Sequence, residues 1–438
     1  MCALATQREE IQFGLCLVPR SDVAIVAHDR TVAVFNYSLQ KKLRCFEPGL
    51  GRICSTCYHA TDLALFLGTD TGRVAKMNMK THSIIYQVDC CKGAQGYKRT
   101  QIVSLQVCEE LDTLLCLDSG KHITFLGLRS GRWKFRTKMG QDSFVKMPIM
   151  YVSCQQRLAL CGDGDGHVIA ASAMSGRIVF DLHVNTDGRA INGMLEAPAL
   201  NKILCCDSGG FITSIDATTQ HQYKKKTSNG RLYCMQLWPQ QEAVLCGGEE
   251  GIFVVRIESG DLLVQCSLAC ERPVSFLCLV PKLKALLCIG GRRGFASCIS
   301  LRTGQEWGKQ LFDVQISKHT IRSARLSEKH NQVFCFDEAR QVVSLDVKLG
   351  GIAFKDCALQ SKIRAMVVSE VQGTVILGDE GGMVKSIDMK SSKINFCRQL
   401  NDDIMALQLS DEHGALFCGE HNGCLTCIDA SSGDLRFK

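Results

Sequence analysis

Short apolar runs recur along the whole chain and are separated by polar, glycine-containing turns. In the last part of the chain the runs lie at 404–410, 415–420, 424–430 and 434–438. Their residues alternate between apolar and polar or are continuously apolar, which predicts short β-strands, because side chains alternate between the two faces of a strand. Serine and glycine at 431–433 predict a tight turn, since glycine adopts positive φ without steric cost.

This four-strand pattern repeats throughout the chain. The turn glycines Gly166, Gly210, Gly251 and Gly294 lie 44, 41 and 43 residues apart. A period of about 40 to 45 residues with four strands per copy is that of a propeller blade. Ten copies are found, at 23–46, 63–85, 113–135, 158–180, 202–223, 243–263, 285–307, 332–354, 374–396 and 415–437.

We therefore predict an all-β protein, a β-propeller of about ten four-stranded blades. The ten repeats, of about 41–48 residues each, tile residues 11–438 after an N-terminal tail at 1–10. Alternatives are two smaller propellers, such as five blades plus five, or a seven-blade ring with three extra units. Three blades could not close by themselves, which disfavours the last arrangement.

One repeat resembles a known propeller family. The pattern G-x-x-x-G-x-x-x-x-I-D-A-x-x-G-D-L at 419–435 is similar to the repeat of quinoprotein (pyrroloquinoline-quinone-type) propellers, and the general cadence resembles degenerate WD repeats. The resemblance implies a propeller used as a binding platform. The copies lack the Gly-His and Trp-Asp pairs of strong WD repeats. Of three tryptophans, Trp133, Trp238 and Trp307, only two lie near the end of a repeat, where quinoprotein blades dock them, so the quinone chemistry is not carried over.

The acidic turn Asp163-Gly164-Asp165-Gly166 could open a calcium loop. Calcium requires six to eight oxygen ligands, but after Asp165 the next carboxylate is Asp181. The spacing Gly-x-x-x-Gly also falls at 68–72, 247–251, 378–382 and 419–423, where the intervening residues differ. Backbone geometry is therefore what the copies share, and we interpret the stretch as a hairpin turn with Asp163 and Asp165 free to face a partner.

The 26 cysteines have a recurring place in the repeat. Seven copies carry cysteine at the same strand position, where Leu67, Leu377 and Val26 stand in other copies. Because free cysteine behaves as a small hydrophobe, this position is interpreted as an apolar packing site and not as part of a disulfide framework. The seven are Cys116, Cys161, Cys205, Cys246, Cys288, Cys335 and Cys418.

Zinc is a weaker hypothesis. Cys54 and Cys57, together with Cys90 and Cys91, could supply four ligands. Cys54 and Cys57 lie three residues apart on an expected strand, however, so their side chains point to opposite faces. We expect no metal site.

Basic residues alternate with aromatic ones at 132–138. Arg132, Lys134, Arg136 and Lys138 share one face of an expected outer strand. Such a face could bind a polyanion through its phosphates. The competing interpretation, which we favour, is an edge strand protected by charge against aggregation.

Composition narrows the function without naming it. The chain has 438 residues, 46% of them hydrophobic and 22% charged, and a formal net charge of +7. This mild excess does not indicate nucleic-acid binding. Arg8, Glu9 and Glu10 interrupt any secretory signal, and no apolar run reaches a membrane span of about 18 residues. We expect a cytoplasmic protein with reduced cysteines; a cytoskeletal or nuclear place stays open.

Signatures of catalysis, such as Gly-x-Ser-x-Gly, His-Glu-x-x-His or a phosphate loop, are not found in the sequence. The sequence therefore favours a non-enzymatic protein-interaction scaffold without cofactor, whose hairpins between second and third strands display variable side chains. The alternatives are a polyanion binder, of nucleic acid or a microtubule surface, and an enzyme with a ligand in the central channel. The residues expected to bind the partner are Asp163, Asp165, Glu249, Glu250, Arg292, Arg293, Glu380, His421 and Asn422.

Overall fold

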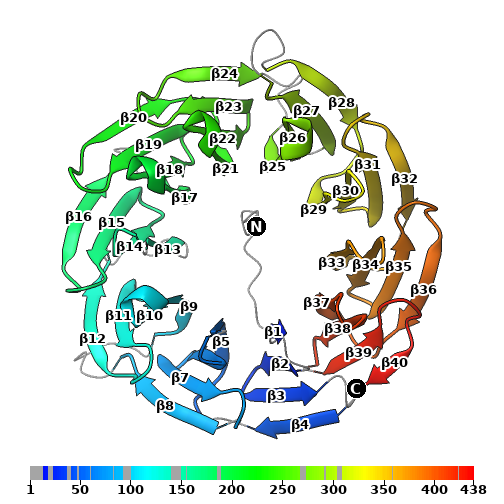
Figure 1. The fold of residues 1–438 in the computed structure, drawn as a ribbon, viewed down its shortest axis with the longest axis horizontal. Helices are drawn as coiled ribbons and strands as arrows, with labels where there is room; N and C mark the ends of the chain where they lie inside the picture. The colour runs from blue at the N-terminus through cyan, green and yellow to red at the C-terminus, as the bar shows by residue number, and fades with distance from the viewer. Residues whose placement is uncertain are drawn as a thin grey trace. The chain divides into compact units, whose positions relative to one another are not determined.

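The computed structural model describes residues 13–17, 23–36, 41–46, 49–59, 61–81, 83–91, 100–139, 149–153, 155–184, 189–266, 273–290, 293–302, 308–357, 359–422 and 424–438. The described strands form ten four-stranded sheets, in each of which the strands pair in chain order (Figure 1). This arrangement confirms the prediction of an all-β, multi-blade propeller fold. The tail expected at 1–10 lies outside the described residues.

We number the sheets 1 to 10 in chain order and name the strands of each sheet A to D, so that turns are AB, BC and CD and the link to the next sheet is the DA connection. The first five sheets are, in order, β1 (Phe13–Leu17), β2 (Val23–His28), β3 (Thr31–Asn36) and β4 (Lys41–Phe46); β5 (Ile53–His59), β6 (Ala64–Thr69), β7 (Arg73–Asn78) and β8 (Ser83–Asp89); β9 (Ile102–Cys108), β10 (Thr113–Asp118), β11 (His122–Gly127) and β12 (Trp133–Lys138); β13 (Ile149–Ser153), β14 (Leu158–Gly162), β15 (His167–Ser172) and β16 (Ile178–His183); β17 (Ile191–Ala197), β18 (Lys202–Asp207), β19 (Phe211–Asp216) and β20 (Gln222–Lys226).

The last five sheets follow the same plan. They are β21 (Leu232–Trp238), β22 (Ala243–Gly248), β23 (Gly251–Arg256) and β24 (Leu262–Cys266); β25 (Val274–Val280), β26 (Ala285–Gly290), β27 (Phe295–Ser300) and β28 (Gln310–Gln315); β29 (Ile321–Ser327), β30 (Gln332–Asp337), β31 (Gln341–Asp346) and β32 (Ile352–Cys357); β33 (Ile363–Ser369), β34 (Thr374–Asp379), β35 (Met383–Asp388) and β36 (Ile394–Gln399); β37 (Ile404–Ser410), β38 (Ala415–Glu420), β39 (Leu425–Asp429) and β40 (Leu435–Phe437).

The described residues form two compact units. The N-terminal unit runs up to Ser208 and includes Thr213–Lys224, so it holds sheets 1 to 4 and most of sheet 5. The C-terminal unit comprises Gly209–Ile212 and Lys225–Lys438, which includes sheets 6 to 10. Within the C-terminal unit, the innermost strands β29, β33 and β37 of successive sheets lie side by side. Whether ten blades form one ring or two stays a prediction.

Four AB turns contain a short 3-10 helix, η1 (Glu109–Leu111), η2 (Pro198–Leu200), η3 (Pro239–Gln241) and η4 (Pro281–Leu283). Three of them begin with proline, which suits the first helical position because its missing N–H would have no partner there. Each is followed by a residue with positive φ, such as Asn201 at 55°. The carbonyl of Asn201 then accepts the N–H of Ala217 at 3.1 Å, which ties the AB turn to the end of strand C.

The outermost strand of a sheet carries a β-bulge near its start. In sheet 6, Val254 faces Val264 while the next residue, Val255, faces Leu262, so Leu263 is the extra residue. The same shift occurs between strands C and D of sheets 1 to 4 and 7 to 10. A bulge interrupts an edge that would otherwise template pairing with another chain, so this bulge protects the outer edge.

Neighbouring sheets are docked by an aromatic ring on a glycine. Gly176, in the CD turn of sheet 4 with φ +68°, leaves space so narrow that an added Cβ would lie 2.3 Å from Cβ of Phe135 in sheet 3. Gly433 receives Phe396 in the same way, and Gly350 receives Phe312. Phenylalanine thus occupies the docking position near the end of the repeat, where the quinoprotein resemblance leads one to expect tryptophan.

The recurring cysteines of strand B are buried. All seven are at most 2% exposed. Cys161, Cys205 and Cys418 pack with leucine, valine or isoleucine of neighbouring sheets. Burial raises the pKa of the Cys161 and Cys205 thiols to about 12. Their interpretation as apolar packing residues is confirmed. The cysteines whose side chains the structure describes are free thiols.

Candidate functional site: the BC edge of the sheets

The candidate site is the edge of the sheets formed by the BC turns and the DA connections, which we call the BC edge. In six sheets a carboxylate that is at most 4% exposed stands at the end of strand B or, in sheet 4, directly after it. These residues are Asp118, Asp163, Asp207, Asp337, Asp379 and Glu420. A buried carboxylate is costly unless it is hydrogen-bonded or paired, so each of them requires partners.

Asp379 shows what such a carboxylate does. Its Oδ1 accepts the N–H groups of Gly381 at 2.9 Å and Met383 at 2.7 Å, which closes the BC turn of sheet 9. Its Oδ2 accepts the N–H of Ser361 at 3.3 Å, in the connection from sheet 8. One side chain therefore closes its own turn and anchors the incoming chain.

Neighbouring sheets repeat this arrangement. Asp337 closes its turn through the N–H of Gln341 at 2.9 Å and accepts a hydrogen bond from the hydroxyl of Ser317. In sheet 10, Oε2 of Glu420 accepts the N–H groups of Asn401 and Asp402, each at 3.1 Å. The BC edge is thus a frame of buried carboxylates that fixes the positions of the turns.

Asp163 belongs to this frame, and the expectation that it faces a partner is wrong. Its Oδ1 accepts the N–H groups of Asp165 and His167, both at 2.9 Å. Its Oδ2 lies 3.3 Å from Nζ of Lys121, a side chain only 7% exposed that reaches over from sheet 3. The hairpin interpretation of this turn is confirmed, since β14 and β15 pair directly.

A calcium ion has little to bind at this turn. Both oxygens of Asp163 are already engaged, and the Lys121 ammonium occupies the space beside the carboxylates of Asp163 and Asp165. In the described ranges, three or more His, Cys, Asp or Glu side chains are nowhere gathered as a metal ion would require.

Asp165 remains at the surface, next to two histidines. Its side chain is 35% exposed and lies 4.0 Å from Nζ of Lys121. The rings of His167 and His183 stack with centroids 4.4 Å apart. Nδ1 of His167 is 3.0 Å from Oδ1 of Asp181, and Nε2 of His183 is 3.1 Å from the carbonyl oxygen of Asp165. The sequence pattern did not place the strand-D residues Asp181 and His183 at the turn.

Glu249 and Glu250 are half-buried and anchor the connection into sheet 6. Glu249 accepts the hydroxyl of Tyr233 at 2.8 Å and the N–H of Arg231 at 3.2 Å. Glu250 accepts the N–H of Asn229 at 2.9 Å. Both residues lie on the BC edge, as expected, but part of their hydrogen-bonding capacity is used within the sheet.

Glu380 pairs with basic residues of its own sheet. Its Oε1 is 2.7 Å from Nη2 of Arg364 and 3.6 Å from Nζ of Lys362. Sheet 8 repeats the pair, with Arg322 Nη2 2.5 Å from Glu338 Oε1. The arginines stand at the second position of β33 and β29, and alignment of the repeats could have revealed both pairs.

Arg293, His421 and Asn422 are exposed on BC turns, as expected of residues that contact a partner. Arg292 lies outside the described residues. Among the eight expected partner-binding residues that the structure describes, Asp163 and Asp165 belong to the N-terminal unit, and the other six belong to the C-terminal unit. The C-terminal unit therefore carries most of the candidate site.

The basic outer strand β12 is largely used by its own sheet. Nζ of Lys134 donates to the carbonyls of Leu111 and Asp112, both at 3.0 Å. Arg136 Nη2 is 2.9 Å from Oδ2 of Asp118. Burial alone would raise the pKa of Asp118, but hydrogen bonds from His122 and Arg136 lower it overall. Arg132 and Lys134 are exposed, and Arg136 and Lys138 are half-buried. Polyanion binding by these four residues stays a prediction.

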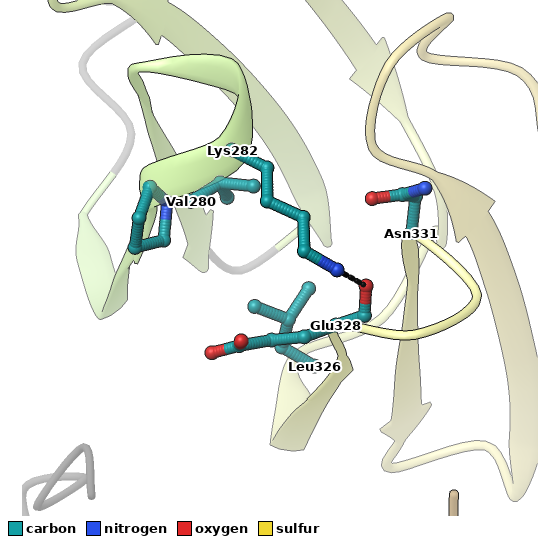
Figure 2. Close-up of a pocket in the computed structure, with 6 residues that line it drawn as sticks. Val280, Lys282, Leu326, Glu328 and Asn331 are labelled. Atoms are coloured by element: carbon teal, nitrogen blue, oxygen red, sulfur yellow. Dashed lines mark hydrogen bonds between the residues drawn. The ribbon is translucent and has the colours of Figure 1, made fainter.

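A small pocket lies at the opposite edge of the C-terminal unit, between the AB turns of sheets 7 and 8 (Figure 2). It is lined by Val280, Lys282, Leu326, Glu328 and Asn331, and Lys282 Nζ donates to the Glu328 carbonyl at 3.2 Å. Its cavity volume of about 10 Å³ is about the minimum that holds one water molecule, whereas small-molecule sites measure roughly 300–1,000 Å³. The pocket does not favour a ligand site.

Within the described ranges, helices of the length and apolarity needed to cross a membrane are absent. No family model matches the sequence. No curated protein matches it either.

Solved structures do resemble the fold. The computationally designed protein Ika8 has a TM-score of 0.50 at 17% identity, covering 76% of this chain and 97% of its own. A chain of a mitotic checkpoint complex has a TM-score of 0.42 at 11% identity, covering 64% of this chain and 86% of its own. At 17% identity the likeness to Ika8 shows the fold alone, and in this chain that fold is built from four-stranded antiparallel sheets.

Proposed function

We propose that this chain is a non-enzymatic scaffold that binds other proteins along the BC edge of its sheets. The proposal rests on the contrast between a fixed frame and varied side chains. Buried carboxylates hold the turns of sheets 8, 9 and 10, whereas the residues that follow them are Glu338, Glu380 and His421. A rigid frame that displays different exposed groups suits selective protein binding.

The repeats are, in this proposal, degenerate copies of quinoprotein-like or WD-like propeller repeats. Support comes from Gly433, which lies in the motif at 419–435 and receives the ring of Phe396. A smaller aromatic ring there replaces the tryptophan that the resemblance leads one to expect. The buried free thiols suit a reducing compartment such as the cytoplasm, because they act as apolar packing groups only while reduced.

The test compares two double variants of the full chain in affinity purification with quantitative mass spectrometry. His421→Glu with Asn422→Asp adds negative charge to the BC edge and keeps the Oδ1 that accepts the N–H of Cys424. The control, Lys348→Glu with Lys390→Glu, changes two exposed CD turns at the opposite edge of the same unit.

We expect the first variant to lose a set of proteins that the control retains, at unchanged thermal stability. Identical protein sets from both variants and the unaltered chain would contradict binding at this BC edge.

A further inference from the structure

Six basic residues gather on the BC edge of sheets 7, 8 and 9 in the C-terminal unit. We call them the basic patch, and they are Arg293, Lys318, Arg322, Arg340, Lys362 and Arg364. Arg293 and Arg340 stand in BC turns, Lys318 and Lys362 in DA connections, and the other two on innermost strands. Only Arg293 was among the residues expected from the sequence to bind a partner.

Hydrogen bonds make this patch continuous. The N–H of Ile316 donates to the carbonyl of Gly294 at 3.0 Å, which holds the connection carrying Lys318 beside the turn of Arg293. The N–H of Glu338 donates to the carbonyl of Thr320 at 3.0 Å, which joins the BC turn of sheet 8 to the connection that enters this sheet. The guanidinium of Arg340 donates to the carbonyl of Gln360, which joins the turn of sheet 8 to the connection that carries Lys362. The frame therefore fixes the six basic groups along one edge.

The patch has a surplus of positive charge. Its six cationic side chains face two carboxylates, those of exposed Glu338 and half-buried Glu380, which leaves an excess of four. Asp337 and Asp379 lie beneath, buried and engaged in the hydrogen bonds of the frame. Asp402 and Asp403, in the next connection, bound the patch on the side of sheet 10. A cationic surface of limited length is therefore presented to a ligand.

The two innermost arginines are already oriented. Glu338 holds Arg322 and Glu380 holds Arg364 at equivalent positions of adjacent sheets. The side chains of Arg322 and Lys362 are still 49% and 47% exposed, so they can reach a ligand. A guanidinium offers five donors in a planar fork that matches a carboxylate, and preorientation lowers the entropy lost on binding.

We propose that the basic patch binds an acidic segment of a partner protein. The ligand class is a peptide whose carboxylates are spaced, because Glu338 and Glu380 stand among the cations and would repel a continuous row of phosphates. This inference rests on the proposed scaffold function and names the chemistry of one partner segment.

The test uses fluorescence anisotropy with the full chain and a fluorescein-labelled peptide of alternating glutamate and serine. A peptide of alternating lysine and serine and a labelled oligothymidine of equal charge to the first peptide are the comparison probes. Lys318→Glu with Lys362→Glu reverses two charges of the patch, and Lys348→Glu with Lys390→Glu is the matched control at the opposite edge.

The glutamate peptide should bind the unaltered chain. Its affinity should fall about tenfold for the patch variant and change less than about twofold for the control, as expected for an interaction between exposed charges. Binding of the oligothymidine alone, or equal loss with both variants, would overturn the proposal. So would the absence of peptide binding.

The scaffold function is judged separately, by the proteins lost with His421→Glu and Asn422→Asp, since neither residue belongs to the basic patch. If those proteins are lost while the peptide does not bind, the inference fails and the scaffold function stands.

Discussion

Lys121 and Asp163 form a buried ion pair between sheets 3 and 4, and a double-mutant cycle can measure its contribution to stability. Nζ and Oδ2 are 3.3 Å apart, and the two side chains are 7% and 4% exposed. Lys121→Met removes the charge and keeps the apolar stem. Asp163→Asn removes the other charge and keeps an oxygen that can accept the N–H groups of Asp165 and His167.

The expected magnitude follows from the distance and the burial. At 3.3 Å and an effective dielectric constant of about 20, the Coulomb attraction is about 5 kcal/mol before desolvation is subtracted. Removing one partner of a buried pair leaves an uncompensated charge and costs about 3–5 kcal/mol. Asp165, 4.0 Å from Lys121, offsets part of that cost for Asp163→Asn. We therefore expect each single change to destabilise the protein by about 3 kcal/mol.

The double variant should be no less stable than either single variant, which corresponds to a coupling energy of about 3 kcal/mol or more. The assay is denaturant unfolding of the full chain, followed together with hydrogen exchange of the β14–β15 hairpin. Strictly additive effects, or single changes below about 1 kcal/mol, would refute the ion pair as a link between these sheets.

Three further results are expected. Gly176→Ala should lower the free energy of unfolding by roughly 2–4 kcal/mol, because it combines a positive φ with overpacking against Phe135. The control Gly351→Ala, where an added Cβ meets no atom within 4 Å, should change thermal unfolding little. Equal shifts of the two variants would contradict aromatic docking. At pH 8 a thiol reagent should label the exposed Cys397 in the native protein but Cys161 only after unfolding, because burial raises the pKa of the Cys161 thiol to about 12. Labelling of both cysteines at one rate would contradict this burial. The N–H of Ser391 donates to Asp388 and lowers the pKa of that carboxyl. The stabilisation from this hydrogen bond is therefore present above the unfolded pKa of about 4 and is lost as pH falls through the lower folded pKa. Asp388→Asn should reduce the change in melting temperature between pH 5 and 2, and an unchanged pH profile would exclude this role.

The repeat was predictable from the sequence because glycine has a specific backbone role in it. Gly166 and Gly382 have φ values of 87° and 79°, which other residues adopt with difficulty, so they persist while their neighbours vary. The cysteines were predictable for a related reason. A position that accepts cysteine, leucine or valine must be apolar, and Cys161 is 2% exposed.

The roles of the charged residues were less predictable. Asp163 and Asp165 look alike in the sequence, yet strand B ends directly before Asp163 and turns its carboxylate inward, while Asp165 stands at the tip of the turn. The basic residues of β12 illustrate the same difficulty. Strict alternation does not hold in β12, because Lys134 is the extra residue of its β-bulge. The acceptors that engage Lys134 and Arg136 lie 18 to 23 residues earlier in the chain. Such contacts depend on how the strands fold back.

Partner binding at the BC edge can be tested by cross-linking mass spectrometry. A lysine-reactive cross-linker would be applied to the full chain together with the proteins that purify with it. Lys318 and Lys362 report on the BC edge, and Lys348 and Lys390 report on the CD turns; all four are exposed in the C-terminal unit. If partners bind at the BC edge, cross-links to them should arise from Lys318 and Lys362. Cross-links that arise instead from Lys348 and Lys390 would contradict it.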